Sequence, residues 1–106
     1  NEFLERLMGD DELVSEIISD FLDVTPSQIA ELKKAVEMQD TEQVEQLSHK
    51  LKGSAGNVSG KAFFEAAKAM EDAARSTDGG LLARSMSDLE EEFDRLRRKM
   101  QEARSK

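Results

Sequence analysis

The sequence lacks cysteine, tryptophan and tyrosine, and its 106 residues include one proline and one histidine. Without cysteine the chain can form neither a disulfide nor a thiolate metal site, which fits a reducing compartment. It also lacks an apolar run long enough to cross a membrane, and no signal peptide is visible. We therefore expect a cytoplasmic location and no membrane contact by this chain.

Positive charge is scarce, because 15 Lys and Arg stand against 23 Asp and Glu, for a net charge of −8. A general nucleic-acid-binding protein needs a basic face, so we expect no nucleic-acid partner. Residues 1–48 carry 13 acids and 3 bases, whereas residues 49–106 carry 10 acids and 12 bases. This change at His49 has two readings: uneven surface decoration, or a histidine whose surroundings are kept less negative.

β-branched residues are few and scattered, and helix-forming residues such as Ala, Leu, Glu, Lys and Arg dominate. A length of 106 residues fits one domain, so we expect residues 1–106 to form a single domain. Because the sequence begins with Asn1 rather than Met, we expect a piece of a longer protein.

Capping signals mark where helices begin. Asp40 has Gln43 three residues further on, which is the pattern of a helix N-terminus. Thr25, followed by Pro26 and by Gln28, predicts a new helix or a kinked continuation. We expect helices over residues 2–8, 11–23, 26 to about 38, 41–57, 61–76 and 81–103. Short loops between amphipathic helices predict an all-α, antiparallel four-helix bundle of up-down-up-down order with a short additional N-terminal helix.

The stretch "SHKLKGSAGN" places the lone His49 in the helix over residues 41–57. At about 100° per residue, the apolar stripe lies within about 60° of Val44, and His49 lies near 140°. Gly53 and Gly56 lie beside the histidine, so it points away from the core with little side-chain bulk around it. The stripe consists of Val44, Leu47, Leu51, Ala55 and Val58.

Each glycine destabilises a helix by about 0.5–1 kcal/mol relative to alanine, so two on one face need a reason. Bare backbone at Gly53 and Gly56 would let another surface approach His49 closely. Imidazole is a nucleophile near neutral pH, and the flanking Lys50 and Lys52 offer charge to an anion such as a phosphoryl group. The alternatives are a decorative surface histidine, a fraying helix end at Gly53, and a glycine that permits close helix packing.

The segment "HKLKGSAGNVSG" resembles the signature of histidine phosphotransfer (HPt) domains, and the likeness spans nearly the whole chain. It implies that His49 is the phosphoacceptor, that Lys52 lies near the phosphoryl group, and that Gly53 leaves room for the partner's active site. Ser59-Gly60 departs from the Gly-Ala that the family often has. The resemblance implies a four-helix bundle.

The resemblance also implies a second layer of residues around the histidine. In the related chemotaxis-kinase phosphotransfer domain, a glutamate on the following helix holds one ring nitrogen of the acceptor. Glu71 stands at the matching position, and Lys68 and Phe64 lie on the same stripe. Glu71 would fix the tautomer and leave the other nitrogen free to attack, with Lys68 beside it. The alternative is a solvated glutamate on a helix face.

The function implied is that of a phosphorelay intermediate, which accepts a phosphoryl group from a receiver-domain aspartate and passes it to another receiver. Such a chain is not an enzyme. It needs no cofactor of its own, because Mg²⁺ is expected on the partner receiver domain. We expect response-regulator receiver domains as partners, a monomer, and a place in the cytoplasmic part of a hybrid sensor histidine kinase.

Other readings stay open beside this one. A non-catalytic helical docking module for a response regulator or a partner helix would need no phosphate chemistry. A di-iron bundle needs Glu-x-x-His pairs on inward faces, and this chain has one outward histidine, with Glu45 four residues before it. A hydrolase lacks its nucleophile set. Apolar candidates for partner contact, each better explained as core, are Ile18, Phe21, Leu22 and Phe64.

Overall fold

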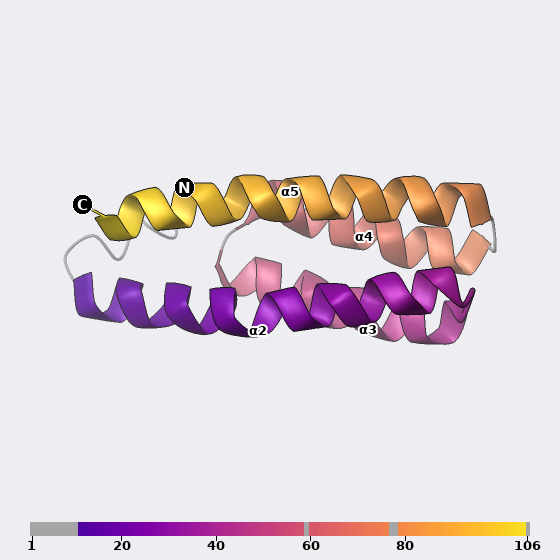
Figure 1. The fold of residues 1–106 in the computed structure, drawn as a ribbon, viewed down its shortest axis with the longest axis horizontal. Helices are drawn as coiled ribbons and strands as arrows, with labels where there is room; N and C mark the ends of the chain where they lie inside the picture. Colours follow the sequence, from indigo (N-terminus) through magenta and orange to yellow (C-terminus); the bar gives the residue numbers. More distant parts are fainter. Residues whose placement is uncertain (1–10, 59, 77–78, 106) are drawn as a thin grey trace.

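The computed structural model describes residues 11–58, 60–76 and 79–105, and these ranges contain four helices and no strand. The helices are α2 (Asp11–Glu37), α3 (Thr41–Asn57), α4 (Lys61–Ser76) and α5 (Gly79–Ser105). In Figure 1 the chain runs one way along the long axis in α2 and α4 and the opposite way in α3 and α5. The predicted all-α class is therefore confirmed. The helix expected over residues 2–8 lies outside the described residues.

Helix α2 runs through Pro26 without interruption, so the new helix start predicted there is wrong and the continuation is correct. Thr25 cannot cap a helix because it lies inside α2 and is buried. A proline inside a helix costs about 3 kcal/mol or more. Ile18 and Phe21 before it, and Ile29 and Leu32 after it, are buried in the same core, and their burial offsets that cost.

Helix α3 begins where the capping signal predicts. The Asp40 side chain accepts a hydrogen bond from the Gln43 amide at 3.3 Å, which satisfies one of the free N–H groups of the first turn. Gln39, just before the cap, has a positive φ of 57° and reverses the chain between α2 and α3. The observed bounds of α3 and α4 agree with the predicted ones, and α5 begins two residues earlier than predicted.

One apolar core joins all four helices, and every residue of the predicted α3 stripe is buried in it. Three phenylalanines from three helices meet there with ring centroids 5.7–6.1 Å apart, and they are Phe21 of α2, Phe63 of α4 and Phe93 of α5. Such edge-on and tilted pairs add stability beyond the area they bury. Ile18 and Phe21 are buried, and Leu22 and Phe64 are partly buried against the core, so these four contribute to packing as expected.

Helices α3 and α4 share the most extensive interface of the bundle. Helix α4 contributes four buried alanines to the bundle: Ala66, Ala67, Ala73 and Ala74. Short side chains let two helix backbones approach closely, and a polar side chain on one helix then reaches the surface of the other. The functional side chains described below lie at this interface.

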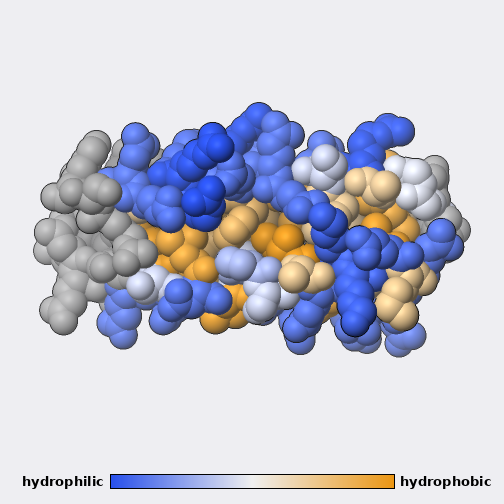
Figure 2. All heavy atoms as spheres, in the orientation of Figure 1, coloured by the Kyte–Doolittle hydropathy of each residue, from blue (hydrophilic) through white to orange (hydrophobic). Residues whose placement is uncertain are grey.

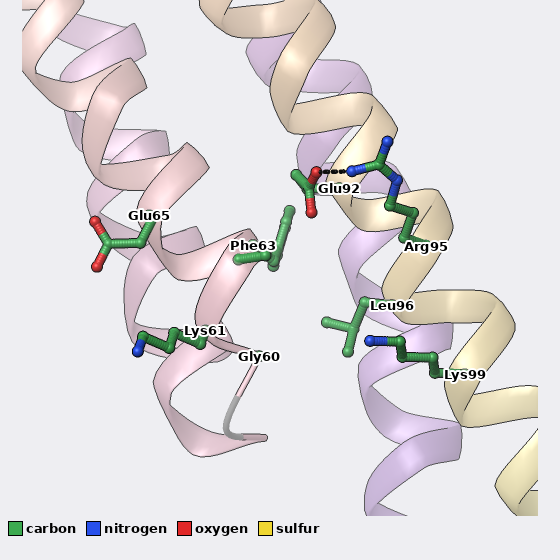
Figure 3. Close-up of a pocket in the computed structure, with 9 residues that line it drawn as sticks. Gly60, Lys61, Phe63, Glu65, Glu92, Arg95, Leu96 and Lys99 are labelled. Atoms are coloured by element: carbon green, nitrogen blue, oxygen red, sulfur yellow. Dashed lines mark hydrogen bonds and ion pairs between the residues drawn. The ribbon is translucent and has the colours of Figure 1, made fainter. Parts of the chain in front are cut away.

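Gly60 lies where α4 begins close to α5, and Figure 3 shows it across a hollow from Leu96. A Cβ atom at Gly60 would lie 2.8 Å from Cδ2 of Leu96, so a larger residue here would displace the Leu96 side chain. The Gly60 carbonyl accepts a hydrogen bond from the Phe64 amide at 2.8 Å and starts the helix. Gly60 therefore has a packing role.

The surface is largely polar, as expected for a chain with 36% charged residues. Figure 2 shows polar residues along the outer sides of α5 and α2, with a band of apolar residues between them. Within residues 11–58, 60–76 and 79–105, no helix is long and apolar enough to span a membrane.

Candidate functional site

His49 stands on the exposed side of α3, opposite the buried stripe. Its side chain is 73% exposed, while Leu47 and Leu51 on either side are buried. The helical wheel predicts this orientation, because both leucines lie close to the centre of the apolar stripe and the histidine does not. The ring is therefore accessible to a second molecule.

Glu71 of α4 lies directly against this ring. Its Oε2 is 3.1 Å from Nδ1 of His49, and its Oε1 accepts a hydrogen bond of 3.0 Å from Nζ of Lys52. The Glu71 side chain is only 7% exposed, so the carboxylate is largely shielded from water. The predicted contact between Glu71 and His49 is present, and the reading of Glu71 as a solvated helix-face residue is wrong.

The Lys52 ammonium that donates to Glu71 lowers the pKa of this carboxyl below its ordinary value of 4.5. Burial opposes this effect by raising the pKa, and the hydrogen bond from His49 and the charge of Arg75 lower it further. Glu71 is therefore ionised at neutral pH. An ionised carboxylate only accepts hydrogen bonds, so Nδ1 must carry the proton and Nε2 of the neutral ring keeps its lone pair.

Arg75 extends the network on the other side of Glu71. It stands one helical turn after Glu71 on α4, and its Nη2 is 4.0 Å from Oε1 of Glu71. Its Nε donates a hydrogen bond of 3.2 Å to Glu45 of α3, one turn before His49. Acidic and basic groups thus alternate across the α3–α4 interface in the order Glu45, Arg75, Glu71 and Lys52.

A shallow hollow opens beside the ring. The residues that line it are Glu42, Glu45, Gln46, His49, Lys50, Glu71 and Arg75. Lysine and arginine on its wall offer positive charge to an anion, while Glu71 and Glu45 are already engaged with cations. In the part of the chain that the structure describes, no three His, Asp or Glu side chains are grouped so that they could hold a metal ion.

Gly53 and Gly56 lie on the exposed side of α3, one and two turns after His49. A Cβ atom built on either glycine meets no atom of the described residues within 4 Å, apart from the nearby backbone of α3 itself. Close packing of another helix therefore does not explain them. Nor does a fraying helix end explain Gly53, because α3 continues to Asn57. The space above both glycines is open for an approaching surface.

One predicted residue lies elsewhere. Lys68 is exposed on α4 and is not among the residues that line the hollow at His49. Its proposed place beside Glu71 stays a prediction. Ser54 lines a different groove, between α2 and the end of α3, together with Val24.

The sequence reasoning did not assign Arg75 and Glu45 to the site. A signal was available, because Arg75 follows Glu71 by four residues, and Glu45 precedes His49 by four. Residues four apart share one face of a helix. What the sequence does not contain is the pairing of these two faces across the interface.

A family model described as Hpt domain matches residues 16–106. The chain belongs to the Hpt domain family. Hpt domains take part in phosphotransfer in two-component signalling and interact with receiver domains. The match covers both α3 and α4, so it includes His49 and Glu71. Comparisons with curated proteins and with solved structures found no match.

The Hpt domain described here thus combines an exposed imidazole with a buried carboxylate against its Nδ1 and a lysine ammonium on the same carboxylate. Hpt domains are phosphotransfer modules and in general are not catalytic enzymes. The helices position these groups from both sides, since α3 provides His49 and Lys52 and α4 provides Glu71.

Proposed function

We propose that this Hpt domain is a phosphorelay intermediate. In this proposal His49 accepts a phosphoryl group from an aspartyl phosphate on a receiver domain and then donates it to another receiver. The observation that carries the proposal is an imidazole that is 73% exposed yet has Nδ1 held by a buried carboxylate. In the neutral ring this combination leaves Nε2 accessible and with a free lone pair.

The transfer step needs no proton movement. The lone pair of Nε2 attacks phosphorus, an N–P bond forms, and the P–O bond to the receiver aspartate breaks with its electron pair on the carboxylate. The ring becomes cationic and keeps its Nδ1 proton, which Glu71 accepts in a hydrogen bond. The reverse of this step on a second receiver passes the phosphoryl group on.

Lys52 and the two glycines have complementary roles in this proposal. Lys52 is 24% exposed and three residues after His49, so its ammonium can turn from Glu71 toward a phosphoryl group on the ring. Gly53 and Gly56 leave the space that the receiver needs to bring its aspartate to Nε2. Positioning and neutralisation of charge are what phosphoryl transfer requires of the protein.

The remaining elements of the proposal concern what the partner supplies. We propose that Mg²⁺ is bound by the receiver, that this chain uses no cofactor and is not itself an enzyme, and that it acts as a monomer. The carboxylates of Glu71 and Glu45, which line the hollow at His49, support the assignment of Mg²⁺ to the receiver, because each contacts a cationic side chain. The up-down-up-down order of the helices would place α3 and α4 as antiparallel neighbours, which suits the shared site.

The test is incubation of the purified chain with a panel of radiolabelled, phosphorylated receiver domains. We expect transfer of a label that is labile to acid and stable to base. Because the sequence has one histidine, His49→Gln should abolish the label. Lys34→Gln is the control, since it changes an exposed lysine of α2 that does not line the hollow and should still accept label.

Label that persists on His49→Gln would contradict the proposal. Binding of a receiver without any transfer of label would also contradict it and would support the alternative of a docking module. The affinity of a receiver for such a docking module should be unchanged by His49→Gln.

A further inference from the structure

If His49 becomes phosphorylated, Lys52 has two anionic groups within its reach, the Glu71 carboxylate and the phosphoryl group. Its Nζ donates to Oε1 of Glu71 at 3.0 Å, and a phosphoryl group on Nε2 would compete for the same ammonium. Phosphoryl groups are strong acceptors that carry more than one negative charge near neutral pH. Lys52 sits on a flexible stem, so it can follow the new charge.

Departure of Lys52 would leave Glu71 in an unfavourable position. The Glu71 side chain is 7% exposed, and a buried carboxylate without a charged partner tends to bind a proton. Protonated Glu71 is a much weaker acceptor for the Nδ1 proton, just when the ring carries positive charge. The site therefore needs a second cation at Glu71.

Arg75 meets this need. Its Nη2 is 4.0 Å from Oε1 of Glu71, the same oxygen that Lys52 contacts. A guanidinium stays charged at all physiological pH values and has donors on several edges. The hydrogen bond from Nε to Glu45 at 3.2 Å holds the group at this distance without using Nη2.

The geometry points to Arg75 as a positioning residue that forms the ion pair with Glu71 when Lys52 turns to the phosphoryl group. Glu45 keeps the Arg75 side chain close to Glu71 by its hydrogen bond. This inference rests on the proposed acceptor role of His49 and extends it to two residues outside the family's motif. Lys50 lines the same hollow and provides a comparison, because it has the same charge and no contact with Glu71 among the described interactions.

The first test needs no phosphate. Nitrogen-15 NMR of the neutral His49 ring should show the proton on Nδ1 in Lys52→Gln and in Arg75→Gln, because one cation remains at Glu71 in each variant. The double variant Lys52→Gln/Arg75→Gln should lose this preference by about tenfold or more. Lys52→Gln/Lys50→Gln, with the same loss of charge, should keep it.

Two results of this first test would overturn the inference. Loss of the tautomer preference in Lys52→Gln alone would mean that Arg75 does not replace Lys52. Retention in Lys52→Gln/Arg75→Gln would mean that Glu71 needs neither cation. Arg75 is 59% exposed, so its replacement should leave the fold intact, which circular dichroism can verify.

The second test uses His49 phosphorylated chemically with phosphoramidate, so that no receiver is involved. Arg75→Gln should then lose the slowly exchanging Nδ1 proton, while Lys50→Gln retains it. Equal exchange in the two variants would contradict the role of Arg75. Because neither test uses a receiver, failure of transfer from receivers would refute the proposed function and leave these results unaffected.

Discussion

The carboxylate of Glu71 meets the ring of His49 across the α3–α4 interface, with 3.1 Å between Oε2 and Nδ1. The two residues are 22 positions apart in the sequence, and their exposures differ sharply, at 7% and 73%. One partner is thus fixed inside the bundle while the other faces outward. This arrangement orients an exposed nucleophile by means of a buried group.

Replacement of Glu71 by alanine should change the tautomer of His49. The hydrogen bond to a carboxylate is worth about 1.5–3 kcal/mol, so its loss should reduce the population with the proton on Nδ1 by about tenfold or more. Nitrogen-15 chemical shifts of the neutral ring measure this ratio. Asp72→Ala is a matched control, because it removes an exposed acid from the next position of α4. An unchanged ratio in Glu71→Ala would refute the orienting role.

Stability should depend on pH through Glu71. Its pKa is lowered in the folded chain from 4.5, chiefly by the Lys52 hydrogen bond, so the unfolded chain binds this proton more readily. The stabilisation from Glu71 is complete above pH 4.5 and is lost as the pH falls through the lowered folded value. Urea unfolding of the wild type and of Glu71→Gln over this range measures it.

The difference in free energy of unfolding between these two proteins should shrink as the pH falls below 4.5. A difference that grows toward acid pH would mean that the folded pKa is raised. Asp72→Asn again provides the control, as an exposed acid on the same helix.

Replacement of Gly53 should stabilise the fold and, when the new side chain is long, impair transfer. The new Cβ meets no atom within 4 Å outside its own helix, so α3 should gain about 0.5–1 kcal/mol in the free energy of unfolding. A longer side chain in Gly53→Gln should lower the second-order rate constant of phosphotransfer by about tenfold, or about 1.4 kcal/mol. Thermal unfolding and transfer kinetics measure the two effects separately.

Gly60→Ala is a comparison for the stability of Gly53→Ala, because a Cβ atom at Gly60 would lie 2.8 Å from Cδ2 of Leu96. The Leu96 methyl must move to admit this atom, so Gly60→Ala should lack the gain in stability expected for Gly53→Ala. Faster or unchanged transfer in Gly53→Gln would refute the access role of Gly53.

Ser48→Ala should leave transfer unchanged and raise stability slightly. The Ser48 hydroxyl is fully buried, and its oxygen has no hydrogen-bond partner among the residues that the structure describes. Since burial of an unpaired hydroxyl is unfavourable, its removal should raise the free energy of unfolding by up to about 1 kcal/mol. Urea denaturation measures the change. A loss of more than about 1 kcal/mol would indicate that the hydroxyl has a partner in solution.

Local signals predicted much of the fold. The Asp40 cap fixed the start of α3, and the apolar stripe from Val44 to Val58 identified its buried face. Two predictions were open at Pro26, and the new helix start was the wrong one, because a capping pattern is a local preference whereas the continuity of α2 depends on burial of Ile18 and Ile29 in one core. A pattern of neighbouring residues does not indicate the free energy of that burial.

The candidate site likewise contains residues that the sequence predicted and residues that it did not. His49, Lys52 and Gly53 share one helix, so their spacing in the sequence already placed them on one surface. The sequence raised Glu71 only through a family resemblance, and it did not raise Arg75 or Glu45 as site residues. Each of these three acts across an interface, and no helical periodicity relates α3 to α4.

The amino-acid sequence by itself determined that this protein is helical, which face of α3 is apolar, and that its single imidazole points to solvent, because these follow from propensity and a period of 3.6 residues. Only the tertiary structure decided which nitrogen of that imidazole is held and how the charges around it are paired. Those properties depend on the depth and rotation at which α4 packs on α3, and the whole core sets that packing jointly.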